Sequence, residues 1–492
     1  MSAAVRPKLE LLRPELVESI IEEALAVLES QGMFVENEEA LGLFAEAGMT
    51  VDRPARRVFI TPALVRKCLA STPSTITLYD RRGERAYTVG GDEVHFDPGS
   101  AAVRILDYRD QVERAALTDD VVNFIRVTDG LDHLHFQSTG LVSGDVPDMV
   151  ADSYRLYLAL LFSGKPVVTG TFKTAGFRPM CDMLTAVRGS AEALRAKPLA
   201  IFDACPSPPL KWSNLTTQSL IDCARAGIPS ELISMGMTGA TSPVTLVGTL
   251  VQHAAENLAG LVICQLARPG APVIFGGSPS SFDMRTGTTP MGAIETMMID
   301  MGYAQIAKSL RLPTHAYMSL SDAKVNDAQS GLETGLGAVL AGLAGINVVS
   351  GPGMLNFESC QSLEKLVIDN ETCGMVYRLL AGITPRETPA ALPLLEAVMR
   401  GGEFLTMPHT RQWFRKEHVY PKIADRDTYD AWVAAGRKTM NDRAHDEVER
   451  LLGSRPPDAP PAAAAAELRR IMKAEAARYG LDRLPPVKGL DA

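Results

Sequence analysis

Four polar side chains within residues 312–333 (LPTHAYMSLSDAKVNDAQSGLE) have a spacing that could serve chemistry. At about 100° per residue, spacings of 4, 3 and 4 place them on one stripe of a predicted helix. The stripe contains two acids and two amides but no base: Asp322, Asn326, Gln329 and Glu333. Such a row of acceptors suits a buried cation. The alternative is an exposed helix start with an Asp or Ser N-cap.

Two nucleophiles near predicted strand ends suggest other chemistry. Lys324 could form a Schiff base with a carbonyl substrate, although it stands beside acids, as a surface lysine often does. Cys205 follows an apolar run, but the sequence identifies no histidine to pair with it. We therefore rank both hypotheses below cation binding.

Alternating apolar and helical patterns indicate the elements that must position these residues. From about residue 131, short apolar runs recur, and each is followed by a Gly/Ser/Pro loop and a helical pattern. Continuous apolar strands alternating with helices predict a parallel sheet. We count seven units, which favours a (β/α)₈ TIM-type barrel, with GEFLTMPHT near residue 403 as a candidate for the eighth strand. In that fold, polar residues at strand ends meet at one face.

The flanking regions have different patterns. Residues 1–130 predict an N-terminal extension with helices and a small antiparallel sheet, and residues 131–385 form the barrel core. Residues 386–492 predict a helical C-terminal region with a Pro/Ala linker near 455–465.

Composition excludes several classes of protein. The net charge of −9 over 492 residues, without a run of Lys or Arg, argues against nucleic-acid binding. Seven scattered cysteines without zinc spacing argue against a metal site and favour the reduced cytoplasm. The longest apolar run, residues 332–349, is broken by glycines and an asparagine, so we expect buried structure and no membrane contact.

Several blocks of sequence resemble the trimethylamine methyltransferase (MttB) family. They include SLSDAKVNDAQSGLE, FDMRTGTTPMGAIE, GMLNFESCQSLEKLVIDNE and PSPPLKWSN, and the similarity extends over nearly the whole chain. The resemblance implies a (β/α)₈ barrel that transfers a methyl group from a methylated amine to a corrinoid. It also implies that the corrinoid sits on a separate carrier protein, with no cofactor bound tightly to this chain.

Leu320 stands at a telling position in this resemblance. The archaeal trimethylamine enzymes of the family carry pyrrolysine just before Ser-Asp-Ala-Lys, and here that position is Leu320. Leucine can form no adduct with an amine. The chain is therefore similar to the glycine betaine:corrinoid methyltransferases, whose quaternary substrates need no proton transfer.

Motif position and charge together give a candidate site. The residues assigned to catalysis are Asp322, Asp327 and Glu333. The residues assigned to substrate binding are Phe202, Phe282, Asp283, Arg285, Tyr317, Leu320, Gln329, Asn356, Phe357 and Glu358. The expected partners are a small quaternary amine and the corrinoid carrier, and the chain is expected to form a homo-oligomer. Two alternatives stay open: a barrel lyase or aldolase using Lys324, and a non-catalytic betaine-binding protein.

Overall fold

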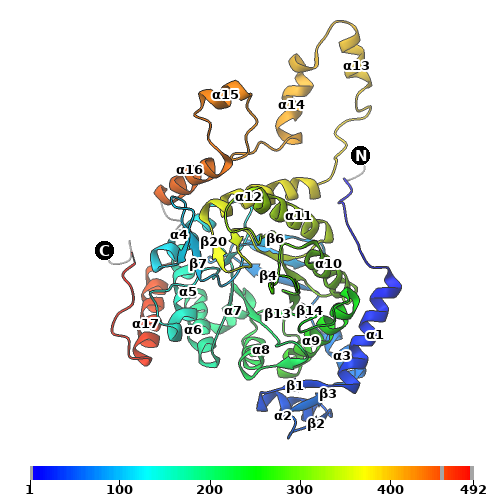
Figure 1. Ribbon diagram of the computed structural model, residues 1–492, viewed down its shortest axis with the longest axis vertical. Helices are drawn as coiled ribbons and strands as arrows, with labels where there is room; N and C mark the ends of the chain where they lie inside the picture. Colours follow the sequence, from blue (N-terminus) through cyan, green and yellow to red (C-terminus); the bar gives the residue numbers. More distant parts are fainter. Residues whose placement is uncertain (1–3, 455–458, 488–492) are drawn as a thin grey trace.

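The computed structural model describes residues 4–454 and 459–487 of the chain. It has an α/β fold in which helices surround a group of short central strands (Figure 1). Five of these strands pair in parallel in the order β15-β13-β11-β10-β9, and three more pair in parallel in the order β17-β18-β6. Their bounds are β6 His95–Asp97, β9 Gln137–Ser138, β10 Val167–Gly170, β11 Ala200–Ala204, β13 Ser230–Ser234, β15 Val273–Gly277, β17 His315–Tyr317 and β18 Val348–Ser350.

The two sets of strands also touch at their edges. Isolated parallel bridges join Phe275 of β15 to Thr314, and Phe96 of β6 to Leu134. The central strands are buried almost throughout, which explains why their sequences read as apolar runs. The pairing of β6 with β18 differs from the antiparallel sheet expected around residue 95, because β6 joins the parallel strands.

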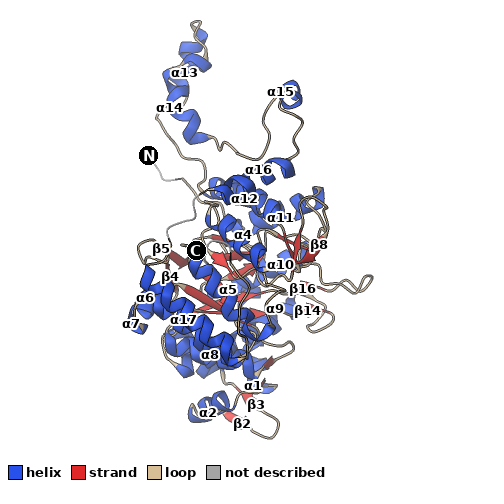
Figure 2. Ribbon diagram, turned by 90° about the vertical axis from the view of Figure 1, so that its left-hand side faces the viewer, coloured by secondary structure: helices blue, strands red, loops and turns tan. Residues whose placement is uncertain are grey.

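Nine helices between Thr118 and Leu380 lie around these strands (Figures 1 and 2). Their bounds are α4 Thr118–Asp129, α5 Asp148–Phe162, α6 Phe177–Arg188, α7 Ala191–Ala196, α8 Asn214–Ala226, α9 Leu246–Ala267, α10 Ile294–Ser309, α11 Ala328–Ala344 and α12 Leu363–Leu380. Helix α9 is long and apolar enough to span a membrane by composition alone, but 83% of its apolar window is buried against the rest of the chain. It is therefore a core helix.

Short strands follow the carboxyl ends of the central ones. β7 pairs antiparallel with β8 and parallel with β20, which pairs antiparallel with β19, while β14 and β16 pair in parallel. Their bounds are β7 Arg104–Leu106, β8 Glu113–Ala115, β14 Met237–Thr238, β16 Ser280–Ser281, β19 Met354–Leu355 and β20 Cys360–Gln361. These strands fix the loops at the carboxyl-end face.

The N-terminal part covers the side and the amino ends of the central strands. Its elements are α1 Pro14–Ser30, β1 Met33–Val35, α2 Glu38–Glu46, β2 Thr50–Asp52, β3 Arg57–Phe59, α3 Pro62–Ser71, β4 Thr75–Tyr79 and β5 Ala86–Gly90, and β1 pairs with β12 Lys211–Trp212. The β4–β5 hairpin buries Ile76 and Leu78 in one apolar cluster with Val168, Ile201 and Ile274 of the central strands. The hairpin thereby seals the amino ends and leaves the carboxyl ends as the accessible side.

The C-terminal region is helical, as expected from sequence. Its elements are α13 Leu392–Met399, the 3₁₀ helix η2 Phe404–Thr406, α14 Pro408–Glu417, α15 Tyr429–Ala434, α16 Met440–Gly453 and α17 Ala462–Arg478. A separate 3₁₀ helix, η1 Thr174–Gly176, precedes α6 in the central part of the chain. The proposed eighth strand near residue 403 is wrong, because this segment forms η2 and α14, with Pro408 at the start of the helix. Part of the predicted Pro/Ala linker, residues 455–458, lies outside the described residues, and α17 begins at Ala462.

Candidate functional site

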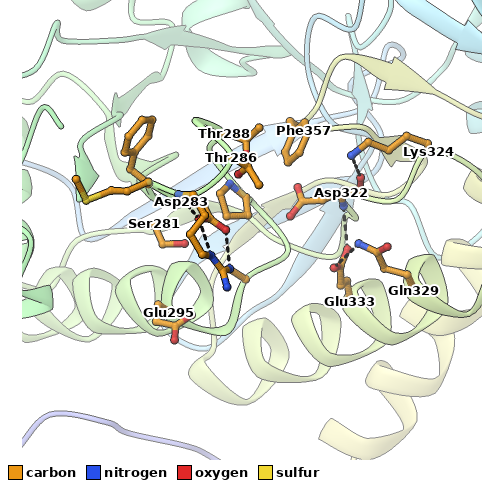
Figure 3. Close-up of a pocket in the computed structure, with 15 residues that line it drawn as sticks. Ser281, Asp283, Thr286, Thr288, Glu295, Asp322, Lys324, Gln329, Glu333 and Phe357 are labelled. Atoms are coloured by element: carbon orange, nitrogen blue, oxygen red, sulfur yellow. Dashed lines mark hydrogen bonds and ion pairs between the residues drawn. The ribbon is translucent and has the colours of Figure 1, made fainter. Parts of the chain in front are cut away.

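A cavity of about 650 Å³ opens at the carboxyl-end face (Figure 3). It lies between the segment that follows β16, the loop that precedes α11, and the loop that precedes β20. Its lining residues are Ser281, Phe282, Asp283, Met284, Arg285, Thr286, Thr288, Pro290, Ala293, Glu295, Asp322, Lys324, Gln329, Glu333 and Phe357. The cavity thus brings together residues that are far apart in the sequence.

Two carboxylates fasten the loop that forms one wall. Asp322 accepts hydrogen bonds from the backbone N–H groups of Met291 (3.0 Å) and Gly292 (2.8 Å). Glu333 accepts hydrogen bonds from the Ser321 hydroxyl (2.6 Å) and the Asp322 N–H (2.8 Å). Burial nevertheless raises the pKa of Asp322 to about 6. Both acids therefore hold the loop in place, in addition to any role in binding.

The predicted helical stripe is wrong in its backbone. Helix α11 begins only at Ala328, and the Asp327 side chain caps it by accepting from the N–H groups of Gln329 and Ser330. Asp322 and Asn326 lie in the loop before it, and Asn326 donates to residues on other elements. Asp322 still meets Glu333, because the loop folds back onto the first turns of the helix.

Lys324 and Phe357 form a second wall. The Lys324 ammonium lies 4.0 Å from the centroid of the Phe357 ring and donates to the backbone carbonyl of Asp322 (2.6 Å). Asn356, Phe357 and Glu358 all have positive φ, at 49°, 55° and 64°. Three successive non-glycine residues in this region are energetically unfavourable, and such strain is concentrated at functional sites.

Asp283 and Arg285 form an ion pair with each other at the cavity entrance. Their ion pair measures 2.7 Å, and the Arg285 side chain is 88% exposed. The hydrogen bonds from Arg285 lower the pKa of Asp283 to about 2. This pair faces solvent, so it has little electrostatic influence on the interior.

A second group of acids lies deeper, among the central strands. Asp97 ends β6, and Asp203 and Glu231 belong to β11 and β13. Burial raises the pKa of all three carboxyl groups. Asp203 raises the pKa of Glu231 further, whereas the interaction with Glu231 lowers that of Asp203. Ser350 donates to Asp97 (2.9 Å), and Tyr317 interacts with Asp203.

Four oxygens of these inner acids lack hydrogen-bond partners among the residues that the structure describes. Within the described part of the chain, Oδ1 of Asp97, Oδ1 of Asp203 and both carboxyl oxygens of Glu231 are buried without a hydrogen-bond partner. The positive charge of Arg155 acts on Asp203, but Arg155 itself is bonded to Thr139 and Asp152. An interior with this surplus of acceptors is suited to a cation.

Glu358 connects the two groups of acids. It is half-buried, and its Oε1 has neither exposed surface nor a partner among the described residues. Burial and, next, the Asp322 charge raise the pKa of Glu358 to about 8. Its charge also acts on Tyr317, which contacts the inner acids. Glu358 is therefore coupled electrostatically to both groups, to Asp322 at the cavity and to Tyr317 beside Asp203.

The described residues contain no group of three or more His, Cys, Asp or Glu side chains placed to hold a metal ion.

Comparison with known proteins places the chain in a family. A family model described as trimethylamine methyltransferase (MTTB) matches residues 3–479. The chain belongs to the trimethylamine methyltransferase (MttB) family. It is 34% identical over 459 residues to the trimethylamine methyltransferase MttB of Desulfitobacterium hafniense (strain DSM 10664 / DCB-2), covering 93% of this chain and 92% of that protein. It is 31% identical over 455 residues to the glycine betaine methyltransferase of strain Y51 of the same species, covering 92% and 94%.

A solved structure also aligns with the chain. The crystal structure of the Methanosarcina barkeri monomethylamine methyltransferase (MtmB) covers 95% of this chain with 93% of its own, at a TM-score of 0.48 and 12% identity. The sequence relatives are named as methyltransferases, and this MttB-family chain is a methyltransferase.

Within this MttB-family site, seven residues predicted from sequence line the cavity. They are Phe282, Asp283, Arg285, Asp322, Gln329, Glu333 and Phe357. Tyr317 and Glu358 lie with the deeper acids.

The other four predicted residues do not line this cavity. Leu320 is buried (1% exposed) close to Gly351, and Phe202 packs against Phe177 with ring centroids 5.5 Å apart. Asp327 is the cap of α11, and Asn356 donates to Glu113 (3.1 Å). These side chains shape the surrounding structure.

The sequence prediction did not include Asp97 or Glu231. Each is an acid within an otherwise apolar strand, in HFD and SELIS. Burying a carboxyl group is costly, so an acid in such a strand is a usable signal for function. Asp97 was hidden because its strand was expected to belong to a peripheral antiparallel sheet.

Proposed function

We propose that this MttB-family methyltransferase moves a methyl group from a quaternary amine of the glycine betaine type to Co(I) of a corrinoid on a separate carrier protein. The observation that carries the proposal is the set of buried carboxyl oxygens without donors at Asp97, Asp203, Glu231 and Glu358. Uncompensated buried acids stabilise an incoming positive charge. A quaternary ammonium suits them because no proton transfer can remove its charge.

The cavity also offers groups for the rest of such a substrate. Phe357 lines the cavity, and aromatic faces attract quaternary ammonium groups, while Tyr317 is buried beside the inner acids. Lys324 donates one hydrogen bond, to a backbone carbonyl, so its ammonium can donate others. We therefore assign the cation to the Glu358 end of the cavity and a substrate carboxylate to Lys324.

The proposed chemistry requires orientation more than proton transfer. The corrinoid supplies the nucleophilic cobalt, and the leaving group is a neutral tertiary amine. Correct positioning alone can contribute about 7–11 kcal/mol to such a displacement. The positive charge on nitrogen disappears during the reaction, so the acids stabilise the bound substrate more than the transition state. We assign Glu358 and the inner acids to substrate affinity.

Exposed apolar side chains at the carboxyl-end face support docking of a carrier protein. Each follows a central strand along the chain, and large exposed apolar groups mark interaction surfaces. They are Val103, Phe172, Met235, Val244 and Met284, with exposed fractions of 54%, 61%, 42%, 68% and 80%. We call this set the rim.

We also propose that the eight central strands close into a (β/α)₈ barrel. The bridges Phe275–Thr314 and Phe96–Leu134 support closure, because they join the edges of the two strand sets. The proposed division keeps residues 1–130, 131–385 and 386–492 as three regions, with β6 contributed to the barrel by the first. We further propose a cytoplasmic homo-oligomer.

A methyl-transfer assay tests the proposed function. The purified protein is incubated with Co(I) cobalamin or a corrinoid carrier and a panel of betaines. We expect loss of the Co(I) absorbance together with one tertiary amine detected by mass spectrometry. A Glu358→Gln variant, which keeps the shape of the side chain, should need far more substrate.

Other outcomes of this assay separate the alternatives. Thermal stabilisation by a betaine without any product would favour a binding protein. Borohydride trapping of a carbonyl substrate, lost in Lys324→Ala, would favour the lyase. Either result would overturn the methyl-transfer proposal.

A further inference from the structure

Residues 383–421, which we call the arm, extend from the body with almost no buried surface. The arm contains α13, η2 and α14 (Figures 1 and 2). Between residues 381 and 443, all of which the structure describes, Ile423 alone is buried. Two helices of 8 and 10 residues without a core are marginal by themselves in water. The arm therefore needs another surface to pack against.

The two ends of the arm are fastened to α12. Arg378 donates to the carbonyls of Gly382 (2.8 Å) and Glu417 (3.2 Å). Glu371 accepts the N–H groups of residues 422–424, at 2.8–2.9 Å. The acid and the base lie two helical turns apart, so both ends of the arm are held at one place. These hydrogen bonds, which we call the root of the arm, fix the position of both its ends on α12.

The arm exposes large apolar side chains along its whole length. Isolated exposed apolar residues are normal, but a set of this size on one element marks an interaction surface. They are Ile383, Leu392, Leu395, Met399, Phe404, Leu405, Val419 and Tyr420, with exposed fractions of 89%, 59%, 50%, 85%, 47%, 83%, 43% and 58%.

A second set of exposed apolar side chains lies on the elements at the root of the arm. We call it the shoulder, and it consists of Leu336 on α11, Met375 and Leu379 on α12, and Leu9 and Leu11 of the N-terminal segment. Their exposed fractions are 41%, 38%, 43%, 37% and 42%. The N–H of Leu9 donates to the carbonyl of Leu343, which holds the N-terminal segment along α11 (3.0 Å).

We propose that the arm of one copy packs on the shoulder of a second copy, and that the exchange is reciprocal about a two-fold axis. A two-fold interface requires one self-complementary surface, and each chain carries both halves on the α11–α12 side (Figure 1). The arm projects away from its own shoulder, so in this conformation the two surfaces of one chain do not cover each other (Figures 1 and 2).

Charge also favours a second copy as the occupant. The chain has a net charge of −9, whereas the arm holds five Arg or Lys and four Asp or Glu. Like-charged bodies approach with least repulsion where the local charge is balanced. The carrier protein proposed above is assigned to the rim instead, which follows the carboxyl ends of the central strands.

Measurement of mass in solution tests the interface. Light scattering after gel filtration should give a multiple of 52.9 kDa for the unaltered chain. The double variant Met399→Asp, Leu405→Asp should give 52.9 kDa, and so should Leu336→Asp, Leu379→Asp. Val244→Asp, which places the same charge on the rim at 68% exposure, should keep the parental mass. Circular dichroism should confirm that all variants fold.

A cross-link between copies tests the identity of the occupant. Leu405→Cys and Leu336→Cys are prepared separately, mixed and oxidised, and we expect a disulfide-linked pair only in the mixture. A chain of 52.9 kDa at all concentrations would overturn the proposal, and so would an oligomer that the arm variants leave intact. An oligomer without this cross-link, whose arm binds another protein, would assign the arm to a different partner.

Discussion

Two groups of carboxyl side chains in this molecule differ in how their oxygens are satisfied. Asp322 and Glu333 at the cavity accept hydrogen bonds from backbone and side-chain donors. Asp203 and Glu231, deeper among the strands, leave buried oxygens without donors in the described part of the chain. The first pair holds a loop in shape. The second pair has oxygens that no hydrogen-bond donor among the described residues compensates, which is the condition for attracting a cation.

The strongest test of this comparison is Glu358→Gln. Removing one partner of a buried charge pair costs about 3–5 kcal/mol, so the KM for a quaternary amine should rise about 100-fold or more. The kcat should change much less, because the substrate charge disappears in the transition state. Steady-state kinetics measure both parameters. An unchanged KM would remove Glu358 from the binding site.

The free energy of unfolding should depend on the cavity acids more than on the inner acids, the reverse of what we expect for substrate affinity. Asp322→Asn leaves one backbone donor on the amide oxygen, places the amide N–H₂ opposite the other and should lower the free energy of unfolding by about 1–3 kcal/mol. Glu231→Gln removes a buried acid without donors and should leave stability equal or higher. Urea denaturation measures the difference. The comparison fails if Glu231→Gln is the more damaging substitution.

The pH dependence of binding should report Glu358. Its pKa is raised to about 8 in the fold, so below pH 8 the group is mostly neutral, and a bound cation favours the ionised form. Binding should therefore release a proton, and affinity should rise by up to about tenfold per pH unit between roughly pH 6 and 8. Calorimetry in buffers of different ionisation enthalpy detects this proton. In Glu358→Gln the dependence should flatten.

A smaller effect is expected at Lys324. Its ammonium is exposed, so solvent screens its attraction for a substrate carboxylate. Lys324→Met should weaken binding of a betaine about fivefold, while a quaternary amine without a carboxylate should bind as before. Competition between the two kinds of ligand gives the ratio. Equal losses for both would place the carboxylate elsewhere.

The smallest effect belongs to the exposed pair at the cavity entrance. Arg285→Gln removes an ion pair whose guanidinium lies mostly in water, and kinetics should change less than about twofold. This variant is the surface control for the interior substitutions. A large loss of activity would show that Arg285 contacts the substrate or the carrier.

Much of the fold follows from sequence because buried parallel strands need long apolar runs. The runs from residue 131 onward correspond to central strands, and the α/β class was predictable. Strand β6 was not, because three residues do not reveal whether their partner is a neighbour in sequence or β18, some 250 residues away. The segment near residue 403 misled because its apolar residues lie on an exposed arm rather than in a core.

The sequence singled out seven residues that line the cavity, but not the geometry that brings them together. The predicted stripe assumed that the helix begins at Asp322, whereas the cap formed by Asp327 starts α11 at Ala328. Asp322 reaches the cavity through a loop whose shape depends on the N–H groups of Met291 and Gly292. Such long-range contacts leave no periodic pattern. The inner acids were detectable only as rare polar residues in buried strands.

The left-handed run of Asn356, Phe357 and Glu358 has a consequence for the timing of energetic costs. The unfavourable backbone conformation is established when the chain folds, before any substrate arrives. Under the proposed function, the aromatic ring and the carboxyl group are thus already oriented, and binding need not freeze a mobile loop. In such a site the chain loses the conformational entropy of this segment when it folds rather than when it binds. The ligand then meets a surface that is preorganised for it.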